Sequence, residues 1–404
     1  MGLFDRFQPL ISSLDEVSAC GANPFGVNLE RVLSPTEAVV NGKETLLLGT
    51  NNYLGLTFDR RCVDAARQAL EVSGTGTTGS RIANGSYSGH TKLEQALAAY
   101  YQRDHGLVFT TGYQANLGVI STIAGPDDFL LIDSDSHASI YDACRLGSAK
   151  VIRFKHNDAK DLDKRLQRLS GEKGNKVIIV EGIYSMLGDT APLQEIVEIK
   201  NKHGAYLVVD EAHSLGVLGA NGRGLAEHAG LDDDVDIIVG TFSKSLGAVG
   251  GFAVSSHPEF EILRVACRPY MFTASLPPSV IASVTTALEI IEKEPKLRDN
   301  LWANVNYVYD SLDRLGFRLG PTKSPIIAVH IESRELATHV WHELLGAGVY
   351  VNLALPPATP GSTSLLRCSI CAAHKREQLE AIVRTLAEIG ERTSLLPRAR
   401  AVGA

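Results

Sequence analysis

Short apolar runs alternate with amphipathic stretches from about residue 100 to residue 255 of this 404-residue chain. This alternation is typical of βαβ units, in which helices join parallel strands and cover the sheet. We therefore expect an α/β fold whose large domain holds a mostly parallel, seven-stranded sheet. The expected strands are Leu107–Thr111, Phe129–Asp133, Val151–Phe154, Val177–Glu181, Tyr206–Asp210, Ile237–Thr241 and Gly251–Val254.

The pattern changes after this region. A long helical stretch follows Pro278 and is expected to break near Pro295, where the ring removes a backbone donor. A strand at Ile326–Ile331, a helix at Leu336–Leu345 and a closing helix at Arg376–Ile389 then predict a smaller α+β domain. The sequence thus predicts an N-terminal segment with an amphipathic helix (1–50), a large ligand-binding domain (51–285) and a C-terminal small domain (286–404).

Composition excludes several classes of protein. The net charge of −7 leaves no basic excess to neutralise nucleic-acid phosphates. No apolar run approaches the roughly 18–20 residues of a membrane span, and Asp5 and Arg6 interrupt any secretory signal. Cys368 and Cys371 form a C-x-x-C pair within a strand-like pattern, but no further ligands lie near them. We expect a cytoplasmic protein without a metal site.

Apolar residues recur at helical spacing near the N-terminus. Phe4, Phe7, Leu10, Ile11 and Leu14 form one apolar stripe. Such a stripe packs against the rest of the chain or a partner subunit, or lies on a membrane surface. Both interpretations stay open, and the second predicts peripheral contact of residues 3–14 with the inner membrane surface.

Two charged residues follow expected strands at a spacing of one βαβ period. Asp210 ends one apolar run, and Lys244 follows the next, 244 − 210 = 34 residues later, between Ser243 and Ser245. Ligands of open α/β sheets bind beyond the carboxyl ends of the strands. Taken alone, such a lysine is usually a solvated surface residue, so the combination carries the argument.

Pyridoxal phosphate (PLP) requires this combination. It needs a lysine to form a Schiff base, a carboxylate to keep its ring nitrogen protonated, and hydroxyl and N–H groups for its phosphate. Gly112 and Tyr113 follow a strand and open a helix, where backbone N–H groups suit a phosphate, although an ordinary strand-to-helix turn looks the same. His137 also follows a strand, and it is either a helix cap or a residue that stacks on the cofactor ring and donates a proton.

These motifs together resemble the α-oxoamine synthases, a family of fold type I PLP enzymes. The resemblance rests on Asp210-Glu211-Ala212-His213, on Gly240-Thr241-Phe242-Ser243-Lys244-Ser245 and on Gly250-Gly251, and it extends over nearly the whole chain. By position it implies that Lys244 forms the Schiff base and later acts as the base. It also implies that Asp210 pairs with the ring nitrogen, that His213 pairs with the ring hydroxyl, and that His137 stacks on the ring.

The resemblance implies further roles. Gly112, Tyr113, Thr241 and Ser243 would hold the cofactor, mostly by its phosphate. Thr273 would reach the phosphate of a neighbouring subunit, which implies a homodimer with shared active sites. Arg367 would bind the amino-acid carboxylate. Asn52 and Ser185 lie in matched motifs near the site, Ser185 on the cofactor side and Asn52 on the substrate side.

The implied activity is the PLP-dependent condensation of an amino acid with an acyl thioester, with loss of CO2. The branch that the chain resembles most uses L-serine and palmitoyl-CoA and makes 3-oxosphinganine, the first sphingolipid precursor. That branch carries an arginine before its Pro-Pro-Ala-Thr-Pro loop, where this chain has Leu355. Glycine or alanine, and another acyl chain or acyl carrier protein, therefore stay open. An inactive scaffolding subunit would lack Lys244, Asp210 or His137, and a transaminase or simple decarboxylase fits the lysine motif less well.

Overall fold

The structure is a computed structural model, and it describes residues 2–19, 23–356, 359, 361 and 363–396. The chain divides into two compact units. The larger unit comprises Asn52–Ser185 and Asp189–Asp299, and the smaller one comprises Met1–Asn51, Met186–Gly188 and Asn300–Ala404. The N-terminal residues thus group with the C-terminal ones, and the larger unit extends beyond residue 285, where the sequence placed its boundary.

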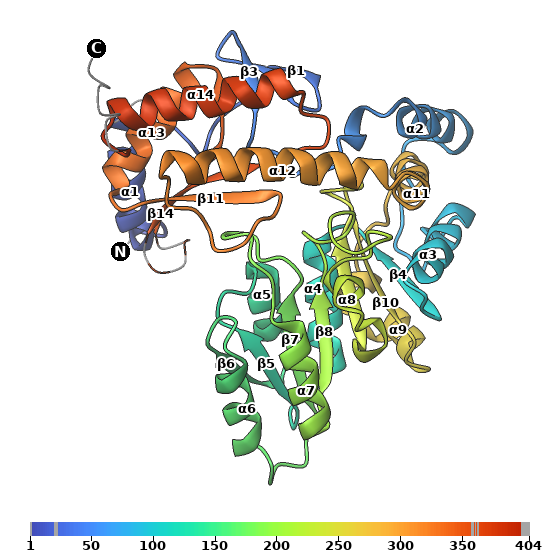
Figure 1. Cartoon of the computed structure of the whole chain (residues 1–404). Coiled ribbons are helices and arrows are strands. Elements are labelled where there is room, and N and C mark those ends of the chain that lie inside the picture. The colour runs from blue at the N-terminus through green and yellow to red at the C-terminus, as the bar shows by residue number, and fades with distance from the viewer. Residues whose placement is uncertain (1, 20–22, 357–358, 360, 362, 397–404) are drawn as a thin grey trace, which may run out of the picture. The chain divides into compact units, whose positions relative to one another are not determined.

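A seven-stranded sheet forms the centre of the larger unit, as the sequence predicts (Figure 1). Its order is β4-β10-β9-β8-β7-β5-β6, with β9, β8, β7, β5 and β6 parallel and β10 antiparallel to both of its neighbours. The strands are β4 (His105–Phe109), β5 (Phe129–Asp133), β6 (Lys150–Phe154), β7 (Lys176–Glu181), β8 (Tyr206–Asp210), β9 (Ile237–Thr241) and β10 (Gly251–Ser255).

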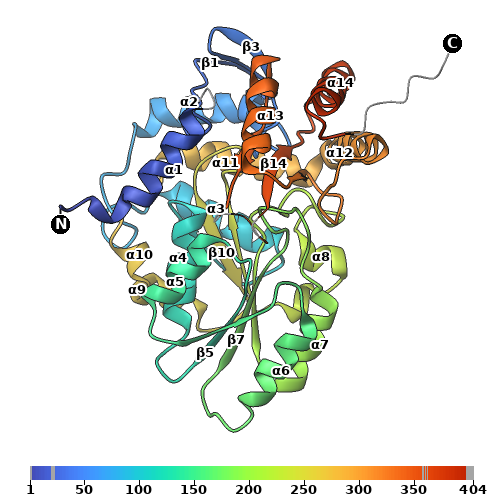
Figure 2. The same cartoon turned by 90° about the vertical axis from the view of Figure 1, so that its left-hand side faces the viewer.

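Helices cover both faces of this sheet. Figure 2 shows α4 (Gly112–Ile123) and α5 (Ala138–Leu146) on one face, and α6 (Ala159–Arg168) and α7 (Leu193–His203) on the other. Strands covered on both faces are apolar throughout, and β5 accordingly is buried at all five positions. Residues such as Leu130, Val119 and Ile140 form the core between the sheet and the α4–α5 face.

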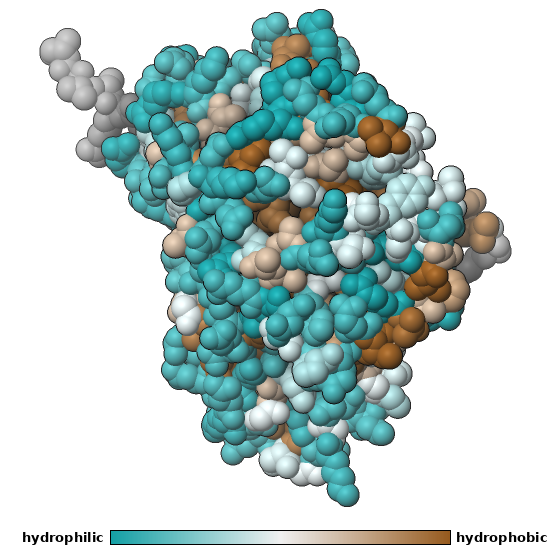
Figure 3. Space-filling view, turned by 90° about the vertical axis from the view of Figure 1, so that its right-hand side faces the viewer, coloured by the Kyte–Doolittle hydropathy of each residue, from teal (hydrophilic) through white to brown (hydrophobic). Residues whose placement is uncertain are grey.

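The remaining helices of the larger unit lie around this layered core. They are α2 (Arg60–Ser73), α3 (Ser88–Tyr100), α8 (Leu225–Ala229), α9 (Leu263–Ala266), α10 (Arg268–Met271) and α11 (Pro278–Lys293), with 3-10 turns η2 (Leu56–Phe58), η3 (Asp232–Asp234) and η4 (Phe260–Ile262). On the face drawn in Figure 3, hydrophilic residues predominate and hydrophobic ones form separate patches.

The smaller unit contains two short sheets. One has the order β1-β2-β3-β12 and the other has the order β11-β14-β13. The strands are β1 (Arg31–Ser34), β2 (Glu37–Val40), β3 (Lys43–Leu47), β11 (Ile326–Ile331), β12 (Val349–Tyr350), β13 (Asn352–Ala354) and β14 (Ser364–Ser369). Helices α13 (Arg334–Gly346) and α14 (Arg376–Arg392) complete it. Helix α12 (Lys296–Leu315) begins after Pro295, so the predicted break after α11 is confirmed.

The N-terminal stripe is exposed. Residues Asp5–Phe7 form a 3-10 turn (η1) and Gln8–Ala19 form α1, so the α-helix begins later than the apolar stripe. Phe4 and Leu10 are 69% and 57% exposed. Among the described residues, no helix is both long and apolar enough to cross a membrane.

Candidate active site

A cavity of about 260 Å³ opens in the larger unit beyond the carboxyl ends of β7, β8 and β9. Eight of the residues singled out from the sequence line it: Gly112, Tyr113, His137, Asp210, His213, Thr241, Ser243 and Lys244. They come from four separate strand ends, and the parallel order of the sheet brings those ends to one edge.

One wall of the cavity is suited to an anion. Helix α4 begins at Gly112 after the cap residue Thr111, whose hydroxyl accepts a hydrogen bond from the Gln114 N–H at 3.0 Å. The N–H groups of the first helical residues have no acceptor within the helix, and the helix dipole favours negative charge there. A Cβ at Gly112 would lie 2.7 Å from the Thr241 side chain, so the close approach of this turn requires glycine.

Hydroxyl groups add to this wall. The Thr241 hydroxyl donates to the Gly250 carbonyl at 2.9 Å. The Ser243 hydroxyl lies 2.9 Å from the Thr241 hydroxyl. The Ser243 N–H also points to the Thr241 oxygen at 3.3 Å. The N-terminus of α4 and these hydroxyl groups together form the kind of site that binds a phosphate group.

The cavity lining also includes a buried carboxylate. Asp210 ends β8 and is 5% exposed. One of its oxygens accepts from the Ala212 N–H at 2.9 Å, and the other accepts from the Asn116 amide at 2.6 Å. Both oxygens of this buried carboxyl therefore have hydrogen-bond donors, which offsets the cost of burying a polar group.

Lys244 and His213 lie on the same cavity. Lys244 is half-buried in the loop after β9, and His213 is 6% exposed in the loop after β8. The Tyr53 hydroxyl lies 2.7 Å from His213 Nδ1 and fixes the imidazole ring. An amine and a carboxylate thus line one cavity, as the sequence predicts.

His137 is the cap residue of α5 and also lines the cavity, so both sequence interpretations of it fit. Its Nδ1 accepts from the Ser139 N–H at 3.2 Å, and its own N–H donates to a Glu181 carboxyl oxygen. Desolvation lowers the pKa of His137 below its ordinary value; the charge of Lys244 adds to this effect, and Asp210 opposes it.

Seven lining residues were not identified from the sequence as site residues, and Asn116, Ser139 and Glu181 are among them. Glu181 ends β7 beside Asp210 of β8, and it is 2% exposed. Burial raises the pKa of Glu181 well above its ordinary value, and the nearby Asp210 adds to this effect, so the neutral carboxyl is favoured. The sequence feature that could have identified Glu181 is an acidic residue at the end of an expected buried strand.

Four predicted site residues do not line this cavity. Asn52 donates to the Thr57 hydroxyl at 2.7 Å, and Ser185 lies in a turn after β7. Thr273 lies between α10 and α11, with its hydroxyl 3.5 Å from the Gln114 amide. Arg367 belongs to the smaller unit, on β14.

Arg367 is held within its own unit. It is 7% exposed, and its guanidinium donates to Asn51 Oδ1 at 3.1 Å and to the Ser369 hydroxyl at 3.0 Å. These contacts fix the direction of the planar guanidinium. A guanidinium held in this way is suited to bind a carboxylate with two parallel hydrogen bonds.

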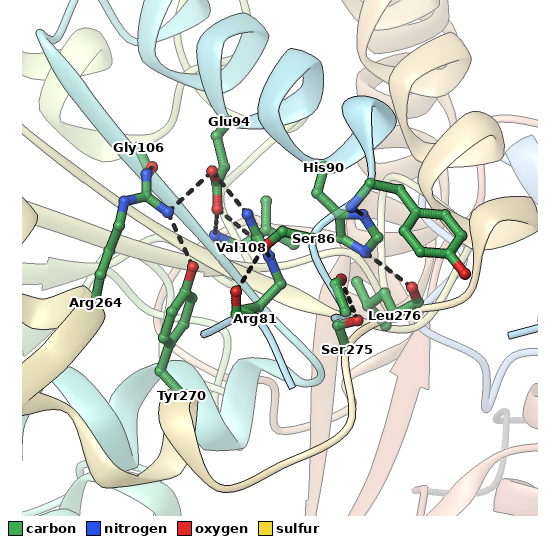
Figure 4. Close-up of polar contacts among 12 residues, drawn as sticks. Arg81, Ser86, His90, Glu94, Gly106, Val108, Arg264, Tyr270, Ser275 and Leu276 are labelled. Atoms are coloured by element: carbon green, nitrogen blue, oxygen red, sulfur yellow. Dashed lines mark hydrogen bonds and ion pairs between the residues drawn. The ribbon is translucent and has the colours of Figure 1, made fainter. Parts of the chain in front are cut away.

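A buried ion cluster anchors one side of the segment that carries Thr273 (Figure 4). Glu94 of α3 accepts from Arg81 at 2.6 and 3.1 Å, from Arg264 at 3.1 Å and from the Val108 N–H at 3.0 Å. Arg264 also donates to the Tyr270 hydroxyl at 2.9 Å. The Tyr270 side chain of α10 is thereby fixed three residues before Thr273.

Hydrogen bonds anchor the other side of the same segment. The Ser275 hydroxyl donates to the Gly85 carbonyl at 2.6 Å, and the Ser275 N–H donates to the Gly79 carbonyl at 2.9 Å. His90 Nε2 donates to the Leu276 carbonyl at 2.9 Å. The backbone on either side of Thr273 is therefore held in place.

A second ion cluster lies at the ends of β5 and β6. His156 donates through Nδ1 to Asp133 at 2.8 Å and through Nε2 to Asp189 at 2.7 Å. Burial opposes protonation of His156, but the hydrogen bonds to both carboxylates outweigh it and raise the pKa of His156 to about 10. Both ring nitrogens are engaged, so an imidazolium rather than a metal ion explains this group of acids.

Comparison with known proteins identifies the family. The family model for aminotransferase class I and II matches residues 43–386. The chain belongs to this family. It is 58% identical over 404 residues to a serine palmitoyltransferase of Caulobacter vibrioides, covering 99% of this chain and 100% of that protein. It is 38% identical over 370 residues to an 8-amino-7-oxononanoate synthase of Symbiobacterium thermophilum, covering 91% of this chain and 94% of that one.

Solved structures agree with this family. A serine palmitoyltransferase from S. paucimobilis with bound PLP–myriocin aldimine superposes with a TM-score of 0.96 at 49% identity, covering 98% of this chain and 100% of that one. The predicted fold type I architecture is thereby confirmed.

Proposed function

We propose that this protein is a PLP-dependent serine palmitoyltransferase. It would condense L-serine with palmitoyl-CoA to 3-oxosphinganine, releasing CoA and CO2. The observation that carries the proposal is the placement of Lys244 and Asp210 on one cavity whose remaining wall is suited to a phosphate. The relatives named serine palmitoyltransferase support the choice of substrates.

The residues of the cavity fit the cofactor. Gly112 and Tyr113 would bind its phosphate with backbone N–H groups, together with the Thr241 and Ser243 hydroxyls. Asp210 would hold the proton on the ring nitrogen. PLP, when bound, supplies an electron-withdrawing ring that stabilises negative charge at the substrate Cα.

Lys244 and His137 would move protons. The Lys244 amine, once displaced by the amino acid, would remove the Cα proton. His137 would donate a hydrogen bond to the acyl-thioester carbonyl oxygen, which makes that carbonyl more reactive toward the substrate Cα. The Lys244 amine can then return a proton after CO2 has left.

Other residues would bind substrate and complete the site. Arg367 would bind the serine carboxylate, and Asn52 would contribute to the substrate side. Thr273 would reach the phosphate bound by a second copy of the chain, giving a homodimer with shared active sites. Ser185 would contact the cofactor.

We place this enzyme in the cytoplasm. The exposed apolar stripe within residues 3–14 would bring it to the inner membrane surface, where its long-chain acyl substrate and lipid product partition.

The test is a matrix of amino acids against acyl-CoAs, read by release of free thiol. Release with L-serine and palmitoyl-CoA, and much weaker release with glycine or alanine, is expected. Release with glycine but not serine would overturn the choice of serine while keeping the reaction class. Leu355, which replaces the arginine expected in this branch, is 6% exposed, so Leu355→Arg is the variant to compare in the same matrix.

A further inference from the structure

Asn116 connects the Asp210 carboxylate to the Ser139 hydroxyl. Its Nδ2 lies 2.6 Å from an Asp210 oxygen and 3.0 Å from the Ser139 hydroxyl. All three residues are at least 95% buried. An ionised carboxylate can only accept, so the amide must present its NH2 group, and that group has one hydrogen for each partner.

The direction of the next hydrogen bond follows from this. The Ser139 oxygen accepts from Asn116, so its own hydrogen is free to be donated elsewhere. His137 Nδ1 lies 2.7 Å from that oxygen. The Ser139 N–H, 3.2 Å away, points to the same nitrogen. With two donors directed at it, His137 Nδ1 has no room for a proton of its own.

We propose that Asn116 and Ser139 are positioning residues that hold His137 as the neutral tautomer protonated on Nε2. The relay begins at the Asp210 carboxylate and ends at the His137 imidazole. It sets which of the two ring nitrogens carries the proton.

The catalytic consequence rests on the proposed function. A neutral imidazole with a proton on Nε2 donates a hydrogen bond to a substrate oxygen and does not bring a second positive charge beside Lys244. The lowered pKa of His137 agrees with a ring that stays neutral. His137 would therefore act in the condensation as a hydrogen-bond donor, and not as a base that competes with Lys244.

The tautomer is measured by NMR of the holoenzyme labelled with 15N in its histidine side chains. The His137 signals are assigned by their loss in His137→Gln. In the wild-type protein, we expect the shift pattern of a neutral ring protonated on Nε2. The pattern of an Nδ1-protonated ring would overturn the proposal.

Two variants and one control test the relay. Ser139→Ala removes the hydroxyl donor to Nδ1, so we expect the Nδ1-protonated tautomer to become detectable and the His137 pKa to rise by about 0.5 to 1, since a net hydrogen bond to the neutral form is lost. Asn116→Ala should shift the same signals in the same direction, but less. Ser136→Ala is the matched control, because the Ser136 hydroxyl is buried without a hydrogen-bond partner in the described part of the chain, and it should leave the signals unchanged.

Unchanged His137 signals in both relay variants, or an equal change in Ser136→Ala, would contradict the proposal. The same spectra are also recorded before PLP is added. They distinguish failure of the relay from failure of the proposed function. The relay is formed by the chain itself, so the tautomer pattern should hold even if the enzyme acts on other substrates.

Discussion

Of the acidic residues that contact Arg264, Glu94 is predicted to cause the largest loss of folding stability when it is replaced. Its carboxylate is 5% exposed and accepts hydrogen bonds from two arginines and one backbone amide. In Glu94→Ala, the buried Arg81 guanidinium, also 5% exposed, loses its counter-ion. Leaving a buried charge without its partner costs about 3–5 kcal/mol. The free energy of unfolding should fall by that amount.

Glu261 provides a matched control. It contacts the same Arg264, but its side chain is 44% exposed, so Glu261→Ala should cost less than about 1 kcal/mol. The assay is urea unfolding of both variants and the wild-type holoenzyme at one protein concentration, followed by circular dichroism. The difference in destabilisation between Glu94→Ala and Glu261→Ala corresponds to roughly 10²-fold in the unfolding equilibrium constant. Equal destabilisation by the two variants would refute the reasoning, because burial would then not decide the cost.

Three further predictions follow from the site and its surroundings. His156→Gln should lower the stability of the protein most below pH 6.5, because the raised pKa of His156 makes its protonation stabilising. The stability difference between wild type and variant should disappear as the pH rises through about 10. Unfolding midpoints of both proteins across this pH range measure the difference. Gly112→Ala should weaken PLP binding about tenfold or more, because the added Cβ clashes with Thr241. Gly171 has open space around it, so Gly171→Ala should leave PLP binding unchanged. An absorbance titration with PLP measures both affinities. Arg367→Lys should raise KM for the amino acid about tenfold with little change in KM for the acyl-CoA, because the bidentate contact is lost; an equal rise in both would contradict a carboxylate-specific role.

Strands β5, β8 and β9 of the large sheet were predictable because nearly all of their residues are buried. Phe129–Asp133, Tyr206–Asp210 and Ile237–Thr241 have the predicted bounds, since each is an apolar run ended by a polar residue. β4 differs, because it begins at His105 and ends at Phe109. Its first residues are not apolar but pair with β10, and Thr111 caps α4 instead of extending the strand.

The short sheets of the smaller unit were harder to predict. β1, β2 and β3 have four or five residues each, and several of these are exposed, so they show little periodicity. β3 pairs with β12, which lies about 300 residues later in the chain. Pairing over such a separation depends on tertiary packing and leaves no local pattern.

The charged residues and the histidine that line the site were predictable, but the residues that orient them were not. Lys244, Asp210 and His137 stand at strand ends, where the chemistry of a cofactor requires particular side chains. Asn116 and Ser139 are ordinary polar residues within helices α4 and α5, and their role depends on how those helices pack together. Such contacts are set in three dimensions, so they become visible only in the structure.

Reduction of the holoenzyme with borohydride, followed by peptide mass spectrometry, tests the cofactor site most directly. Borohydride fixes PLP to the lysine that binds it. We expect the label on the peptide that contains Lys244, and no label in Lys244→Ala. A label on a different lysine, or bound PLP that borohydride never fixes to the chain, would contradict the assignment of this cavity as the active site.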